Sequence, residues 1–137
     1  RNRDRVAEAV ARCRSLGLHV SLFLDPDEAQ VEAAASLGVQ AVELHTGRYA
    51  LADSDASHLR ELESLQVAGR MIRASGMDLH AGHGLNYRNS ASVAQIEGMA
   101  ELNIGHSIVS RAVMVGIERA VSEMKQCIHD ALIARIA

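Results

Sequence analysis

The sequence predicts an α/β protein built on a parallel sheet, and three observations lead to this fold class. Short apolar runs alternate along the chain with longer segments whose apolar residues recur at helical spacing. The unit of helix, glycine-containing turn, strand and polar loop recurs four times, and Ser-Leu-Gly precedes the first two apolar runs at Ser15–Gly17 and Ser36–Gly38. Strands that alternate with helices imply right-handed crossovers and therefore parallel strands.

The helical segments carry recognisable start and stop signals. Gly17 follows the first apolar repeat, where it can end the helix in a left-handed cap. Asp25 is expected to cap the second helix, with Pro26 in its first position and Glu28 completing a capping box. Thr46 is expected to begin a loop. Helices are predicted at about residues 4–16, 26–38, 55–74, 91–100, 107–114 and 117–135.

The strands are short apolar runs between turn signals, as expected for a parallel sheet buried on both faces. They are predicted at residues 19–24, 40–45, 77–81 and 101–105. Four βα units are half of a TIM barrel, and none of these strands has the features that protect a free sheet edge. We therefore expect residues 1–137 to be a single partial domain: the C-terminal half of a (β/α)8 TIM barrel. It would hold strands five to eight, with helices outside and a short extra helix after strand eight, and the N-terminal half would be absent.

Composition excludes several classes of partner. The 137 residues are 48% hydrophobic and 23% charged, with a formal net charge of −3, so no basic surface for nucleic acid is expected. No apolar run approaches the roughly 20 residues of a membrane span. The first residues are polar and do not begin with Met, which indicates a piece of a longer protein. Cys13 and Cys127 are isolated and are expected to be free thiols in a reduced compartment.

Polar residues gather where the predicted strands end, the edge at which parallel βα folds bind ligands. Four of the seven histidines fall near these ends: His45, His80, His83 and His106. Glu43 and His45 are two residues apart, so both point to one face of their strand. A carboxylate facing a barrel interior needs a partner or a role. Glu43 is therefore a candidate for catalysis or ligand binding, or else forms an ion pair with Arg or Lys; His45 acts directly or simply orients Glu43.

A second group of residues combines glycine with histidine. Gly82 and Gly84 flank His83, which allows close backbone approach to a ligand and presents an imidazole that can exchange protons near neutral pH. The alternative is a tight turn with a solvated histidine. His80 stands at odd spacing from His83, so on a regular strand the two face opposite sides, and we expect His80 to be a satisfied core residue or to face the helices.

The predicted short helix after the fourth strand begins at Gly105-His106-Ser107. TIM barrels often bind phosphate with the loops after strands seven and eight and the N-terminus of such a helix, whose free N–H groups and dipole attract anions. The segments Gly82–Gly84 and Gly105–Ser107, which follow the third and fourth predicted strands, are thus the candidate phosphate-binding elements, although two ordinary glycine turns would show the same pattern. No compact metal motif such as H-E-x-x-H or paired C-x-x-C is present, so no metal site is expected.

Taken together, the segments at the strand ends resemble, in order, the C-terminal half of the pyridoxine 5′-phosphate synthase family. The resemblance covers essentially the whole chain. It is carried by residues 20–25 (VSLFLD), 42–47 (VELHTG), 81–87 (AGHGLNY), 101–108 (ELNIGHSI), 110–114 (SRAVM) and 120–125 (AVSEMK).

The resemblance implies a cytoplasmic transferase, assembled as a homo-octamer, that uses no metal or organic cofactor. Members condense 3-amino-2-oxopropyl phosphate with 1-deoxy-D-xylulose 5-phosphate, release phosphate and water, and form pyridoxine 5′-phosphate in vitamin B6 biosynthesis. Carried over by motif, His83 is the proton donor, Glu43 stabilises the transition state, and Gly84, Gly105 and His106 bind the amino-ketone phosphate. The family's first four βα units are missing here, so we expect this segment alone to be inactive.

Two other interpretations remain open at the level of sequence. One is a different phosphate-binding barrel, although no strand ends in the Lys that a Schiff-base aldolase would need. The other is a small α/β phosphate-binding or signalling domain without enzymatic activity, with Asp25 as a regulatory acid. That second interpretation leaves the two Gly-His elements unexplained.

Overall fold

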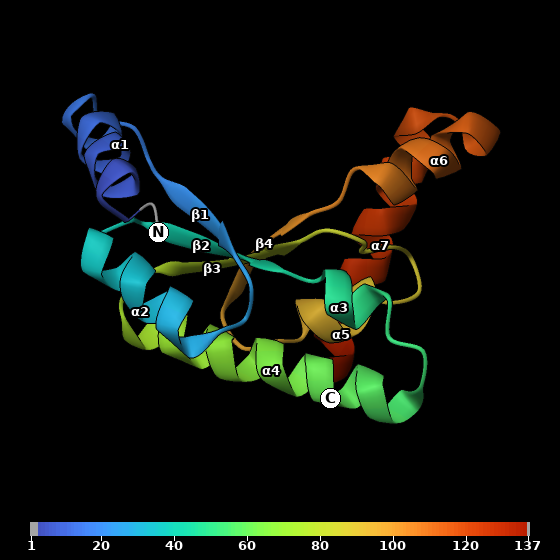
Figure 1. Ribbon diagram of the computed structural model, residues 1–137. Coiled ribbons are helices and arrows are strands. Elements are labelled where there is room, and N and C mark those ends of the chain that lie inside the picture. The colour runs from blue at the N-terminus through green and yellow to red at the C-terminus, as the bar shows by residue number, and fades with distance from the viewer. Residues whose placement is uncertain (1–2, 137) are drawn as a thin grey trace.

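The computed structural model describes residues 3–136 and has a parallel sheet at its centre (Figure 1). The four strands pair in chain order, β1-β2-β3-β4, and every pair is parallel. They are β1 (Ser21–Leu24), β2 (Ala41–His45), β3 (Asp78–Gly82) and β4 (Met99–Asn103). The predicted α/β class and the parallel strands are therefore confirmed.

Helices connect the strands and continue beyond the last one. They are α1 (Arg3–Ser15), α2 (Glu28–Leu37), α3 (Gly47–Ala50), α4 (Asp55–Ala74), α5 (Ser90–Ala94), α6 (His106–Val115) and α7 (Ile117–Ile136). α2, α4 and α5 pack against the strands on one side of the sheet, and α7 packs against α5 and α6 (Figure 1). The short extra helix predicted after the fourth strand is α6.

The helix-covered face of the sheet holds the core. Val42 and Leu44 of β2 and Leu79 and Ala81 of β3 have no exposed surface. They pack with apolar residues of α1, α2, α4 and α5 in one cluster. Burial of such side chains contributes roughly 1.5–3 kcal/mol each, so this face supplies most of the stabilisation.

The opposite face carries a row of side chains across the strands that begins with the aromatic Phe23 and continues with polar residues. The strand register places Phe23 beside Glu43, Glu43 beside His80, and His80 beside Glu101. Phe23 is 54% exposed and Glu101 is also exposed. No helix within residues 3–136 covers this face (Figure 1). The sheet therefore separates a packed apolar side from an open polar side.

Of the two expectations for His80, the one that it faces the helices is wrong, whereas its side chain is largely buried, with 15% exposed. Leu79 and Ala81 take the helix side, so His80 lies on the same face as Glu43, with its Nδ1 3.9 Å from Glu101 Oε1. The expectation assumed that a regular strand continues to His83. β3 ends at Gly82 instead, and the backbone turns at His83, so the two histidines are not related by strand alternation.

Several element boundaries also differ from those predicted. β1 begins at Ser21 rather than at residue 19, and β4 spans Met99–Asn103 rather than 101–105. α2 begins two residues late: Asp27 is its N-cap and accepts a hydrogen bond from Gln30 N, whereas Asp25 is bonded to His45. α5 ends at Ala94 because Gly98 turns with φ +75° and β4 already starts at Met99. The loop expected from Thr46 contains the single-turn helix α3.

α6 stands apart from the sheet (Figure 1). None of its residues is buried, and Val113 is 80% exposed. An ion pair links it to α7: Arg111 of α6 donates from Nε to Glu123 Oε2 at 2.8 Å. Within α7, Arg119 donates to Glu123 Oε1 at 2.8 Å. The two guanidinium groups, Arg111 first, lower the pKa of Glu123 to about 2.

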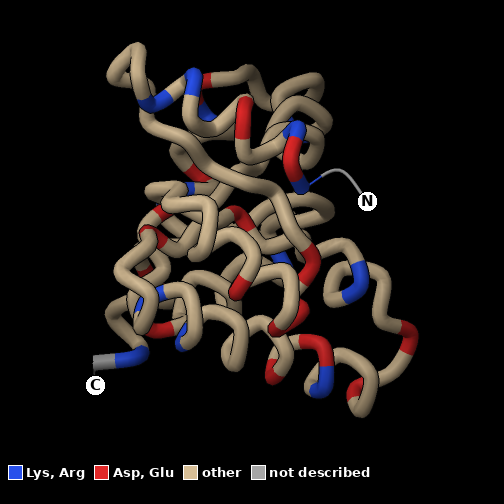
Figure 2. The backbone as a smooth tube through the Cα atoms, turned by 60° about the vertical axis from the view of Figure 1, so that its left-hand side comes forward, with Lys and Arg blue, Asp and Glu red and all other residues tan. Residues whose placement is uncertain are grey.

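Charges of both signs are interspersed along the tube, without a long run of either (Figure 2). Among the described residues, no helix combines the length and the apolar character needed to cross a membrane. Cys13 and Cys127 are both free and partly buried, as predicted.

Candidate functional site at the carboxyl edge of the sheet

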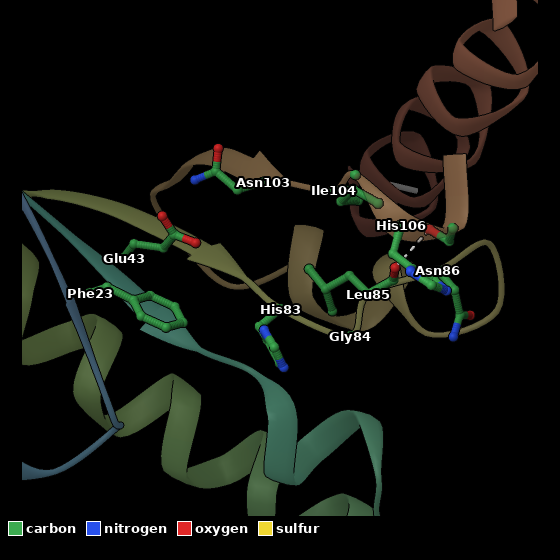
Figure 3. Close-up of a pocket in the computed structure, with 11 residues that line it drawn as sticks. Phe23, Glu43, His83, Gly84, Leu85, Asn86, Asn103, Ile104 and His106 are labelled. Carbon is green, nitrogen blue, oxygen red and sulfur yellow. Dashed lines mark hydrogen bonds between the residues drawn. The ribbon is translucent and has the colours of Figure 1, made fainter. Parts of the chain in front are cut away.

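A cavity of about 740 Å³ opens at the carboxyl ends of the strands (Figure 3). Its wall combines strand ends, the loop after β3 and the first turn of α6. The lining residues are Phe23, Glu43, His83, Gly84, Leu85, Asn86, Asn103, Ile104, Gly105, His106 and Ser107.

All five residues selected from the sequence line this cavity: Glu43, His83, Gly84, Gly105 and His106. They come from β2, from the loop after β3, and from the start of α6. Residues more than 60 positions apart in the chain therefore meet at one edge of the sheet. Their roles in binding and catalysis stay predictions.

The Glu43 carboxylate lies over the backbone of Gly82. A Cβ at Gly82 would collide with Glu43 Oε1 and would lie 3.0 Å from Asn103 Cβ, so only glycine fits here. In Figure 3 the carboxylate stands between Phe23 and Asn103. No ion pair or hydrogen bond of Glu43 occurs within residues 3–136, so the Arg or Lys partner considered from the sequence is not found in this part of the chain. The carboxylate is thus free to face a ligand.

His83 has a left-handed backbone with φ +83°, and among the described residues it is the one non-glycine residue with positive φ. This conformation is unfavourable for a residue with a Cβ and persists where the surroundings hold it; such strain clusters at functional sites. Gly84 follows with φ +79°. The turn therefore places the exposed His83 side chain between Gly82 and Gly84, two residues without side chains of their own.

Thr46 stabilises this turn through hydrogen bonds to its backbone. Its buried hydroxyl lies 2.7 Å from the carbonyl oxygen of Gly82 and 2.6 Å from that of His83, and its N–H donates to Gly82 O at 2.8 Å. Sequence reasoning assigned Thr46 only to the start of a loop. A hydroxyl directly after a strand end was the available signal, but its partners are 36 and 37 residues away.

The far wall of the cavity is the N-terminus of α6. Gly105 is the N-cap and provides no side-chain cap, so the first-turn N–H groups of α6 have no intrahelical partner. Ser107 donates from Oγ to Leu85 O at 2.8 Å and ties this turn to the loop after His83 (Figure 3). Free N–H groups and the positive end of the helix dipole favour an anion at this position.

The loop between Gly84 and α5 is also anchored. Asn89 accepts from Asn86 N at 2.7 Å and donates to Gly84 O at 3.2 Å. Tyr49 of α3 donates to Asn89 O at 2.8 Å, and burial raises the pKa of its phenol, so the phenol stays a donor at neutral pH. The Gly84 wall of the cavity is therefore preorganised.

His45 lies outside this cavity. It lines a neighbouring cavity of about 460 Å³, which His83 also lines, so His83 stands in the wall between the two. His45 Nδ1 lies 3.1 Å from Asp25 Oδ1. Its ring packs against His83 rather than orienting Glu43.

Nothing in residues 3–136 assembles three or more His, Cys, Asp or Glu side chains in a way that could hold a metal ion. His19 and His129 are exposed, and His58 packs against Tyr49 with ring centroids 4.2 Å apart. The cavity combines the Glu43 carboxylate, the imidazoles of His83 and His106, and a helix N-terminus.

Comparison with known proteins identifies relatives along nearly the whole chain. Residues 1–130 match the family described as pyridoxal phosphate biosynthesis protein PdxJ. A pyridoxine 5′-phosphate synthase of Rhodopirellula baltica is 58% identical over 130 residues, which are 95% of this chain and 52% of the relative. One from Magnetococcus marinus is 50% identical over 131 residues, covering 96% of this chain and 54% of the relative. The chain thus spans about half the length of the curated relatives it matches.

A solved structure shares the fold at low sequence identity. A chain in the crystal structure of the Amycolatopsis orientalis BexX/CysO complex superposes with a TM-score of 0.66 at 18% identity. The likeness covers 97% of this chain and 50% of that one. At this identity it concerns the fold alone.

Proposed function

Since the chain belongs to the PdxJ family of pyridoxal phosphate biosynthesis proteins, we propose that the complete protein containing it is a pyridoxine 5′-phosphate synthase. One observation carries the proposal at the level of the site. Glu43, His83 and the N-terminus of α6 line a single cavity at the carboxyl edge of a parallel sheet.

The reaction joins 3-amino-2-oxopropyl phosphate to 1-deoxy-D-xylulose 5-phosphate and loses phosphate and water. The phosphate of the amino ketone lies against the N–H groups of Gly84, Gly105 and His106, where the helix dipole offsets its charge. His83 donates a proton to a departing hydroxyl, because a hydroxyl leaves as water only when protonated. The Glu43 carboxylate stabilises the positive charge that develops on the imine nitrogen.

The fold of this segment is proposed to be half of a TIM barrel. Three features support this: the strands follow chain order, one face of the sheet lacks a helical cover among residues 3–136, and the relatives are about twice as long. A second set of four βα units would close the sheet and enclose the polar row of Glu43, His80 and Glu101.

The segment alone is proposed to be inactive, because half of such an active site would come from the other βα units. We also propose for the complete protein the octameric assembly and cytoplasmic location implied by the family. The exposed apolar residues of α6, such as Val113, are compatible with contacts to further chain.

The test is a turnover assay of the complete protein with both phosphorylated substrates, following pyridoxine 5′-phosphate by chromatography. The wild type is expected to form product, residues 1–137 alone none, and Glu43→Gln about 10²–10³-fold less, since removing one electrostatic stabiliser typically costs this much. Absence of product from the wild-type protein, or full turnover by Glu43→Gln, would overturn the proposal.

A further inference from the structure

Three aromatic rings stand in contact along the open side of the sheet, at the ends of β1, β2 and β3. The ring centroids of Phe23 and His45 are 5.1 Å apart in an edge arrangement. Those of His45 and His83 are 4.7 Å apart, with the planes tilted by 56°. His45 therefore stands between a fixed strand residue and the imidazole at the wall of the cavity.

The His45 ring is held at its other side by Asp25. Asp25 Oδ1 accepts from His45 Nδ1 at 3.1 Å, and the two side chains are 58% and 30% exposed. A carboxylate at Nδ1 fixes both the tautomer and the plane of an imidazole. This bond also accounts for why Asp25 does not cap α2.

Gly47 makes the contact between the two imidazoles possible. A Cβ at this position would lie 2.9 Å from His45 Nε2 and 3.3 Å from His83 Cδ2. Both rings thus approach one point above the backbone of Gly47. Figure 3 shows the His83 ring directed toward the end of β2, the side on which His45 lies.

The orientation of the His83 side chain depends on such contacts, because the loop that carries His83 does little to fix it. The residue is exposed, sits in a loop, and lines a cavity on each side. Its backbone is held by Thr46, but backbone bonds leave the side-chain torsions free. A proton donor must lie within hydrogen-bond reach of its target, and a misplacement of about 1 Å can cost on the order of 10²-fold in rate.

We propose that Asp25 and His45 are positioning residues for His83: Asp25 fixes the His45 ring, and the His45 ring restricts the His83 imidazole to the orientation used in proton transfer. The inference rests on the proposed function of His83. It gives a role to Asp25 and His45, which take no part in the reaction scheme proposed above.

The test uses the complete protein in kinetic and spectroscopic arms. Asp25→Ala and His45→Ala are each expected to lower kcat by about 10- to 100-fold with KM nearly unchanged, because misorientation affects the transition state more than binding. Asp25→Asn keeps an oxygen that accepts from Nδ1 and is expected to retain most of kcat. The double variant is expected to be no worse than His45→Ala, since Asp25 acts through His45.

The spectroscopic arm needs no substrate. In protein labelled at the histidine rings, the NMR signals of the His83 ring are expected to shift and broaden in both Ala variants. A matched control exists at the opposite ends of the strands, where His19 Nε2 lies 3.8 Å from Asp78 Oδ2. Asp78→Ala breaks this comparable pair and should leave the His83 signals and kcat unchanged.

The two arms separate the two proposals. If the wild-type protein forms no product, the proposed function fails, and the His83 signals alone decide the positioning role. Unchanged His83 signals in His45→Ala, or additive losses of kcat in the double variant, would overturn the positioning role. Asp25→Ala guards against a folding defect in His45→Ala, because Asp25 is largely exposed and its loss leaves the core intact.

Discussion

The two faces of β2 and β3 differ in burial and in the kind of side chain that they carry. Leu44 and Leu79 point to one face and have no exposed surface, whereas Glu43 and His80, their immediate neighbours in the chain, point to the other. Helices cover the first face, and none within residues 3–136 covers the second (Figure 1). Alternate residues of the same strands thus face either the apolar core or the side that carries the cavity. Substitutions one position apart should therefore have unrelated effects on stability and on turnover.

The largest effect is expected at the edge of the polar face, in His83→Ala. Loss of the proposed proton donor should lower kcat of the complete protein by about 10²–10⁴-fold. The melting temperature should change little, because His83 is exposed and the contact that Ala loses, with the His45 ring, lies outside the apolar core. Steady-state kinetics and thermal unfolding measure the two quantities, with the exposed His129→Ala as the control. A melting temperature that falls together with kcat would show that the two faces are not independent.

Two adjacent residues of β3, Leu79 and His80, test the difference between the two faces directly. Leu79→Ala removes a fully buried side chain and should lower the free energy of unfolding by about 2–5 kcal/mol, through lost burial and the cavity left behind. His80→Ala, one position along, should lower the free energy of unfolding by clearly less than Leu79→Ala, because His80 keeps 15% of its side chain exposed and lies outside the apolar cluster. Denaturant unfolding of both variants is the measurement. Equal losses would mean that the polar face is as tightly packed as the apolar one.

Much of this arrangement could be predicted from the sequence because it depends on local chemistry. Short apolar runs between glycine turns gave all four strands, and Gly17 and Gly38 do take left-handed conformations after their helices. The positions of Glu43 and His83 at strand ends followed from the rule that parallel strands share a carboxyl edge. Alternation along β2 then placed Glu43 and His45 on one face.

What escaped prediction depends on contacts between distant residues. Asp25 carries a strong capping signal, yet its carboxylate bonds to His45, 20 residues away, and Asp27 caps α2 instead. The face of His80 was misassigned because the turn at His83 breaks strand alternation, and positive φ at a histidine has no marker in the sequence. Thr46 was missed because its partners are brought to it only by the pairing of β2 with β3.

A moderate effect is expected at Thr46, whose hydroxyl links the end of β2 to the turn at His83. Thr46→Val keeps the volume but leaves the carbonyl of His83 without its hydroxyl donor, which should destabilise the fold by about 1–3 kcal/mol. Turnover should fall as well, because the strained His83 backbone loses its support. Thr46→Ser, which retains the hydroxyl, should behave nearly as wild type. Equal stability of Thr46→Val and wild type would show that the hydrogen bonds of the Thr46 hydroxyl do not stabilise the turn at His83.

The smallest effect is expected far from both faces, where Arg111 and Arg119 hold Glu123. Because the folded pKa of Glu123 lies below its ordinary value of 4.5, the attachment of α6 to α7 gains stability above pH 4.5 and loses it as the pH falls toward 2. An NMR titration of the Glu123 carboxyl carbon should give a midpoint near 2, and Arg111→Gln should raise it. A wild-type midpoint at the ordinary value would contradict the ion pairing seen here.

The central claim is that Glu43, His83 and the first turn of α6 act on one phosphorylated molecule. A crystal structure of the complete protein with 3-amino-2-oxopropyl phosphate bound tests this most directly. The account predicts the phosphate against the N–H groups of Gly84, Gly105 and His106, with the reacting carbons between Glu43 and His83. A phosphate bound at another edge of the sheet, with this cavity filled only by water, would contradict it.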